Sequence, residues 1–290
     1  MTRRPTHIPL LTHRRRAAAA ALSLVAGALS GCSADFERAR GAEGIFEAVR
    51  MQSGPPPREL AAMAVDPYDA NNRYLGTAGL AGAYFAGGEA YLALFEDNAD
   101  DPDAGVRSAA LRGLGNHGEQ RHAALLVRGL RDPDQQVRLE AARGLQRIHD
   151  PGVIPALLSA IRPPSGAAAQ PGEEPDPDVR AEAAAALGQY AEARVVEGLI
   201  ATLLDESLGV NRAALMSLRT LTGQDYGLDH EGWVGWRDRT TDADEMFRGR
   251  GLYLYPVFRR SRWWWEYLPL IPPPPNEVPA TPVGLPRTQS

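Results

Sequence analysis

One arrangement of apolar and polar positions recurs along the middle of this 290-residue chain. Each copy opens with an acidic turn, which in three copies contains proline. It continues with Val-Arg or Val-Asn and then carries apolar residues at three- and four-residue steps. The valines that align the four clear copies are Val106, Val137, Val179 and Val210, and a weaker copy precedes them around Gly76. Apolar residues at this spacing form one stripe along a helix. The pattern therefore predicts an amphipathic helix at the start of each copy.

A second helix is predicted after the first in each copy, over residues 121–130, 153–161, 195–204 and 229–239. The aligning valines are separated by 31, 42 and 31 residues, and the extra residues fall in 163–175, whose Pro, Gly and Ala content predicts a loop insertion. At Asp132 we expect the side chain to N-cap its helix, with Pro133 in the first helical position. Two helices per copy cannot bury their apolar stripes alone, so the copies must stack.

The Asp-Pro-Asp, Val-Arg, Ala-Ala and Leu-Gly elements of these copies resemble the HEAT repeats, in particular the short bacterial type that also occurs in phycobilin lyases. The resemblance covers roughly residues 58–239 and implies an all-α fold, a right-handed α-solenoid of helical hairpins. In this family the repeated Asp and Arg form structural ladders. The resemblance therefore assigns Asp101, Arg107, Asp132 and Arg138 to architecture rather than to ligand contacts. It implies no particular activity, because one fold hosts many functions.

The N-terminus has the features of a secretory signal. Residues 1–16 contain five Arg and no acid, and the apolar run that follows has 13 residues, fewer than the roughly 20 that span a bilayer. The segment Leu29–Ser30–Gly31–Cys32 resembles the lipobox of bacterial lipoproteins. That resemblance implies cleavage before Cys32 and attachment of lipid, including palmitate, to its sulfur. We therefore expect a lipid-anchored protein of the bacterial cell envelope, facing outside the cytoplasm in the periplasm or at the outer surface.

The charge balance bears on the class of partner. The whole chain has 31 basic residues, all of them Arg, against 36 acidic ones, which gives a net charge of −5. Removal of residues 1–31 takes away five Arg and no acid, which leaves −10. An acidic protein outside the cytoplasm is a poor nucleic-acid binder. Cys32 is the sole cysteine, so no intrachain disulfide can form.

No motif in the chain points to catalysis, a cofactor or a metal. The histidines beyond the predicted cleavage site are His117, His122, His149 and His230. The first two are five residues apart, which is not the i,i+4 spacing that places two ligands on one helical face. Residues 97–103 are dense in oxygen ligands but lack the calcium-loop pattern, so an inter-repeat turn with helix capping is favoured. We therefore expect no enzyme activity and no bound cofactor.

The C-terminal tail concentrates aromatic and basic residues. Residues 246–268 carry five Arg against one Glu, and the four prolines at 272–275 favour an extended chain. Three interpretations remain open: a cap over the last helices, a contact site for a protein partner, or a lipid headgroup contact. The candidate contact residues are Trp263, Trp264, Trp265, Arg259, Arg260 and Arg262.

Together these observations predict four parts. They are a lipoprotein signal peptide (1–31), a tether from the lipidated Cys32 (32–57), a HEAT-like repeat domain (58–240), and an irregular aromatic and Pro-rich tail (241–290). The predicted function is a membrane-anchored extracytoplasmic scaffold or adaptor that presents its solenoid surface to a protein of unknown identity. The alternatives are a structural tether of the cell envelope, or an enzyme with an unrecognised acidic or His-containing site.

Overall fold

The computed structural model describes residues 55–165, 173–258 and 277–286. The chain divides into two compact units, Met1–Pro57 and Arg58–Ser290, and nearly all described residues belong to the second. The predicted signal peptide, the tether as far as residue 54 and residues 166–172 of the predicted insertion lie outside the described residues. Among the helices that the structure does describe, none is both long enough and apolar enough to cross a membrane.

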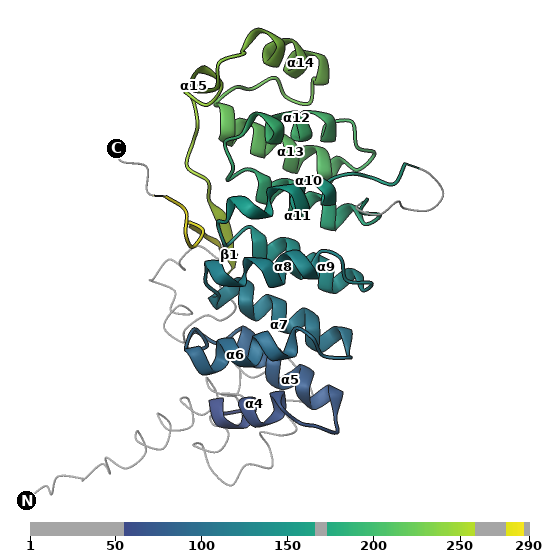
Figure 1. Ribbon diagram of the computed structural model, residues 1–290, viewed down its shortest axis with the longest axis vertical. Helices are drawn as coiled ribbons and strands as arrows, with labels where there is room; N and C mark the ends of the chain where they lie inside the picture. The colour runs from purple at the N-terminus through teal and green to yellow at the C-terminus, as the bar shows by residue number, and fades with distance from the viewer. Residues whose placement is uncertain (1–54, 166–172, 259–276, 287–290) are drawn as a thin grey trace, which may run out of the picture. The chain divides into compact units, whose positions relative to one another are not determined.

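Helices make up most of the described residues (Figure 1). Two short 3₁₀ turns, Gln120–His122 and Pro151–Val153, lead directly into α8 and α10. The helices are α4 (Pro57–Ala64), α5 (Ala70–Ala81), α6 (Glu89–Asn98), α7 (Ala104–His117), α8 (Ala123–Gly129), α9 (Gln135–Leu145), α10 (Ile154–Ala160), α11 (Pro177–Leu187), α12 (Ala193–Thr202), α13 (Leu208–Thr222), α14 (His230–Arg239) and α15 (Ala243–Met246).

The helices of this unit form two layers. The first helices of successive hairpins, α5, α7, α9, α11 and α13, pack against one another in chain order. The second helices, α6, α8, α10 and α12, each pack against the first helix of the following hairpin, and α12 also contacts α14. Figure 1 shows the resulting stack of hairpins. The predicted all-α solenoid of helical hairpins is therefore confirmed, and the weak copy around Gly76 forms its first hairpin, α5 and α6.

Small residues allow the first helices to approach closely. The valines that aligned the repeats are all buried, as the predicted stripe requires. Between α7 and α9 a Cβ built on Gly115 would lie only 2.8 Å from the Cα of Gly144, so the two backbones meet directly. Such contacts leave no room for a side chain, and filling them costs about 1–3 kcal/mol. The glycines and alanines of the repeat thus set the distance between neighbouring hairpins.

The start of the first helices corrects one prediction. Asp134, and not Asp132, caps α9 by accepting backbone N–H groups of its first turn. Asp103 and Asp176 cap α7 and α11 in the same way. The predicted cap is wrong because the carboxylate of Asp132 is already bonded by Arg107 and by the N–H of the residue two positions later. The helix therefore begins two residues later than the Asp-Pro pair suggested.

Part of the tail forms strands that the prediction of an irregular segment did not include. Strand β1 (Tyr255–Phe258) pairs antiparallel with β2 (Glu277–Ala280), with Tyr255 opposite Ala280. Beyond β2, Val283 exchanges backbone hydrogen bonds with the loop after α9, donating to Arg147 and accepting from His149. The tail therefore runs back from the last hairpin to the level of α9, along the ends of the helices.

Candidate interaction surfaces

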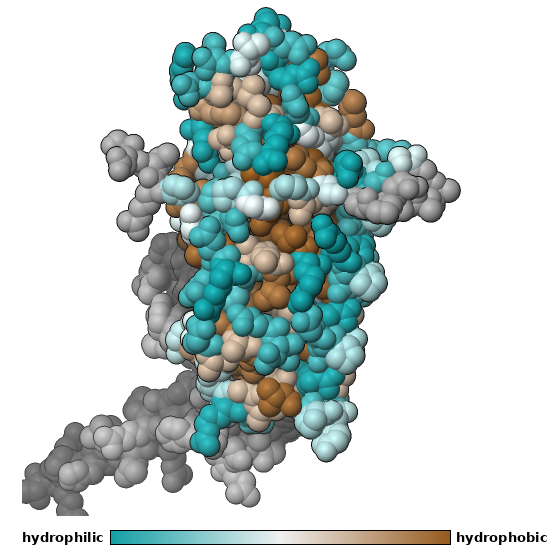
Figure 2. Space-filling view, in the orientation of Figure 1, coloured by the Kyte–Doolittle hydropathy of each residue, from teal (hydrophilic) through white to brown (hydrophobic). Residues whose placement is uncertain are grey.

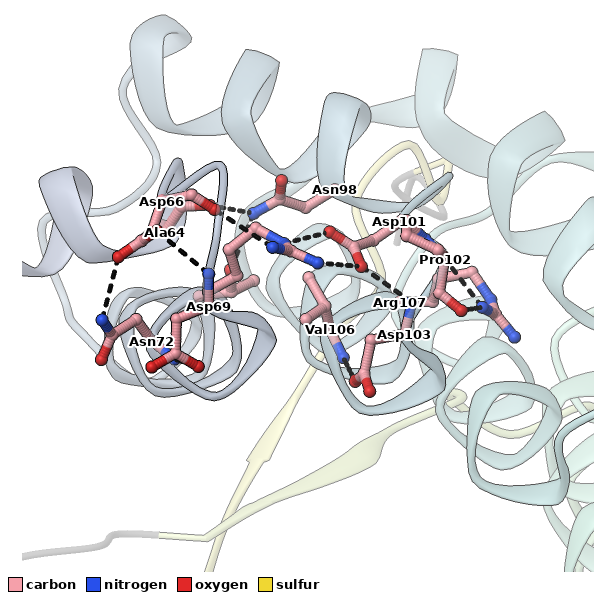
Figure 3. A network of polar contacts seen from close by, with 12 residues as sticks. Ala64, Asp66, Asp69, Asn72, Asn98, Asp101, Pro102, Asp103, Val106 and Arg107 are labelled. Carbon is pink, nitrogen blue, oxygen red and sulfur yellow. Dashed lines mark hydrogen bonds and ion pairs between the residues drawn. The ribbon is translucent and has the colours of Figure 1, made fainter.

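One arginine position links each hairpin to the next. Arg107 donates through Nε and Nη2 to both carboxylate oxygens of Asp132, at 2.8 and 2.9 Å. Its Nη1 donates to the carbonyl oxygens of Asp101 and Pro102 in its own turn, as Figure 3 shows. The equivalent pairs are Arg73–Asp101, Arg138–Glu174 and Arg180–Asp205. The prediction that the repeated Asp and Arg are architectural is confirmed by these contacts.

The acid side chains of this ladder are largely shielded from solvent, and for Asp101 and Asp132 the pKa is lowered. Burial alone would raise the pKa of Asp101, but hydrogen bonds from Arg73 and from a backbone N–H outweigh it and lower that pKa. The pKa of Asp132 is lowered for the same reasons, with Arg107 as the donor. Where the pair is buried, as in Arg180–Asp205, removing one partner costs about 3–5 kcal/mol, because the other charge is left without compensation. These carboxylates therefore serve to hold neighbouring hairpins together.

Sequence reasoning missed one member of the ladder. Glu174 accepts from Arg138 at 2.8 and 3.1 Å, across the predicted loop insertion. Its N–H also donates to the carbonyl oxygen of Arg162, which brings the two ends of the insertion together. The signal was present, because Glu174 precedes Val179 by five residues, as Asp101 precedes Val106. The ladder acid of each copy is therefore the acidic residue five positions before the aligning valine.

The ladder ends in the last hairpin, where Asn211 stands at the arginine position. Its Oδ1 is buried and has no hydrogen-bond partner among the described residues. An asparagine side chain is too short to make the contact with both a carboxylate and the carbonyl oxygens of its own turn that Arg107 makes, so among the described residues the ladder does not continue from α13.

The predicted contact residues of the tail, Trp263, Trp264, Trp265, Arg259, Arg260 and Arg262, lie outside the described residues, as does the predicted lipidation site Cys32. The described part of the tail packs on the repeats. Tyr253 is buried, Arg250 donates to the carbonyl oxygen of Gln189 at 2.8 Å, and Gly251 donates its N–H to Thr220. Whether the tryptophans cap, bind a partner or meet lipid stays a prediction.

The acidic segment 97–103 consists of the end of α6 and the inter-repeat turn that leads to α7, so the predicted turn is confirmed. Asp101 accepts from Arg73, Asp103 caps α7, and Asp100 pairs with Arg128 at 2.8 Å. Within the described part of the chain, no three His, Cys, Asp or Glu side chains are grouped so that they could hold a metal ion.

An apolar groove lies between the second helices α10 and α12. We call it the second-helix groove, and it encloses a cavity of about 710 Å³. Its apolar lining includes Pro155, Leu158, Gly198, Ala201 and Leu204, and Leu204 is 66% exposed. Figure 2 shows apolar side chains gathered over α8, α10 and α12, between hydrophilic margins. An apolar centre with a polar rim is the composition of a protein-binding surface.

A second, polar groove lies between the first helices and the tail. We call it the arginine groove, and it has a volume of about 470 Å³. Its charged and aromatic lining is Arg112 from α7, Glu140 and Arg143 from α9, Arg147 from the loop after α9, Glu182 from α11, and Tyr255 from β1. Glu140 is buried and accepts from both Arg112 and Arg143. Glu182 accepts from Arg143 and Gln146.

Comparison with known proteins identifies the repeats. Residues 92–170 and 167–227 match the family described as HEAT repeats. Among solved structures, one engineered protein shares 19% identity over 67% of this chain and 94% of its own, with a TM-score of 0.46. A second engineered protein shares 17% over 67% and 95%, with a TM-score of 0.44. The complex of CpcE and CpcF of phycocyanin lyase from Nostoc sp. PCC7120 shares 23% over 58% and 78%, with a TM-score of 0.39. No curated protein matches the sequence.

Proposed function

Because this chain is a HEAT-repeat protein, we propose that it is a binding scaffold whose second-helix groove receives a protein partner. We also propose that lipid on Cys32 anchors it outside the cytoplasm. HEAT repeats suggest protein interaction, and stacked hairpins supply an extended, preformed surface. The observation that carries the proposal is the apolar groove between α10 and α12, with Leu204 exposed at its edge. The proposed role is not catalytic.

Each helix layer carries an exposed apolar side chain, and comparing the two provides a matched test of the groove. Leu204, in the turn after α12, is 66% exposed, and Met216 of α13 in the other layer is 58% exposed. A photo-crosslinking amino acid is placed at each position in turn, in native membranes. Photochemistry suits this chain, since it contains no Lys for amine-directed reagents.

We expect one discrete cross-linked protein from position 204 and none from position 216. Leu204→Glu should prevent binding of that protein, measured with both components purified, while Met216→Glu should leave it unchanged. Identical cross-linking from the two positions would refute the assignment of the second-helix groove.

The anchoring part of the proposal is supported by the basic region, the short apolar run and the lipobox-like segment ending at Cys32. A single acyl chain binds membranes weakly, and a second makes the anchoring stable. Metabolic labelling with palmitate, followed by membrane fractionation, tests the proposal on wild type and Cys32→Ser. Label and membrane association should both disappear in the variant, and Ser33→Ala serves as the control. A variant that keeps the label would show that Cys32 is not the lipidated residue.

A further inference from the structure

Arg147 differs from the other arginines that line the arginine groove or form the ladder. Each of those arginines contacts a carboxylate oxygen at 3.1 Å or less. Arg147 donates through Nη1 to the amide oxygen of Asn116, and its guanidinium carbon lies 5.5 Å from the centre of the Tyr255 ring. Among the described residues no carboxylate lies within ion-pair distance of it.

The described lining of the groove therefore holds one positive charge in excess. Its cations are Arg112, Arg143 and Arg147, and its anions are Glu140 and Glu182. Both glutamates are bonded to other residues of the groove, as described above. Burial lowers the pKa of Arg147, and Arg143 lowers it further, against the opposing effects of Tyr255, Glu140 and Glu182. A partly buried cation with only neutral partners is costly, and a carboxylate would offset that cost.

We propose that Arg147 binds a carboxylate side chain, Asp or Glu, of an extended partner segment lying in the arginine groove. Charge complementarity identifies the ligand, since the groove needs one negative charge to become neutral. A guanidinium offers a planar fork of donors that matches a carboxylate, and the Tyr255 ring limits how that fork can turn.

This contact lies on the first-helix layer, so it is separate from the second-helix groove and does not depend on it. The described tail contributes Tyr255 as one wall, so the site requires both the repeats and the returning tail. The two surfaces together would let one scaffold hold two segments of a partner, one apolar and one acidic.

The test uses short peptides of defined chemistry and the purified full chain. The acidic probe is acetyl-Ala-Glu-Ala-Glu-Ala-amide, and the matched control replaces each Glu by Gln. Arginine-selective ¹⁵N labelling reports on the Nε–H signal of each guanidinium group. We expect a saturable shift of the Arg147 signal with the acidic peptide in the millimolar range and none with the neutral one. Binding should weaken about tenfold in Arg147→Gln and be unchanged in Arg131→Gln, whose arginine is exposed and lies outside the groove.

Several results would overturn the proposal. Equal binding of the Gln peptide, or no saturable shift of the Arg147 signal in the wild type, would show that no carboxylate is bound there. Undiminished binding in Arg147→Gln would place the contact on another residue. Tighter binding of acetyl-Ala-Ala-Ala with a free carboxylate would assign the site to a chain terminus. A shift of the Arg147 signal on Glu266→Gln alone would show that the chain itself supplies the acid. Arg147→Lys keeps the charge and should retain part of the binding, which separates loss of the contact from loss of folding.

Discussion

Removing a single ladder arginine should destabilise the stack far more than removing an exposed one. Arg180 joins α11 to the turn before α13, and its side chain is 7% exposed, while that of its partner Asp205 is 1% exposed. Arg180 donates to both oxygens of Asp205 at 2.8 and 3.1 Å, and to two carbonyl oxygens of its own turn, each at 2.9 Å. The perturbation is Arg180→Met, which keeps most of the apolar stem and removes all four of these hydrogen bonds.

The expected magnitude follows from what the substitution leaves behind. Among the described residues the Asp205 carboxylate keeps one hydrogen bond, from the N–H of Ser207 at 2.8 Å, and two carbonyl oxygens lose the hydrogen bond from Arg180. A buried ion pair broken on one side costs about 3–5 kcal/mol. The matched control is Arg121→Met, whose pair with Glu89 is mostly exposed, with side chains 48% and 72% accessible. That control should change the free energy of unfolding little.

Guanidinium unfolding followed by circular dichroism measures the loss, and hydrogen exchange locates it. Because each hairpin contacts only its neighbours, we expect amide protection to fall first in α11–α13 and to persist in α5–α7. The double variant with Asp205→Asn should cost less than the sum of the single changes, because the two groups interact directly. Equal costs for Arg180→Met and Arg121→Met, or strict additivity in the cycle, would refute the claim that the ladder holds the hairpins together.

Three further predictions follow from individual contacts. Gly76→Ala should destabilise the first hairpin by about 1–3 kcal/mol, because the added Cβ would lie 2.5 Å from a carbonyl oxygen of α4. The control is Gly87→Ala, whose Cβ would meet nothing within 4 Å, so this variant should leave thermal unfolding unchanged. The pKa of Asp132 in the folded protein is below its ordinary value of 3.8, so the contribution of Asp132 to stability is present above pH 3.8 and is lost as the pH falls through the lowered value. Asp132→Asn should therefore destabilise the protein at neutral pH. The variant should also lose less stability than the wild type on acidification, as measured by circular dichroism. Tyr253→Ala should release the described tail from the repeats, seen as lost amide protection in the tail alone, while Leu252→Ala, at a side chain 59% exposed, should not.

The repeat pattern predicted most of the helices because each one depends on contacts within a single copy. Apolar residues at three- and four-residue steps and an aspartate before the first turn act over one or two turns of chain. For the same reason the valine positions identified the buried stripe without any knowledge of the neighbouring hairpin. The first-helix cap was misplaced by two residues because Asp132 and Asp134 are chemically alike. Only the position of Arg107, on α7, decides which of them is free to cap α9.

The sequence by itself thus determined the succession of hairpins, the burial of the aligning valines and the architectural role of the repeated Asp and Arg. Only the tertiary structure decided the pairing of Arg138 with Glu174, the return of the tail to the loop after α9, and the position of Arg147 beside Tyr255, where no carboxylate of the described residues pairs with it. The physical reason is range. Helix formation is settled by neighbours a few residues away, whereas these contacts join residues 36 positions apart or more. They therefore arise only once the copies have stacked and brought distant side chains together.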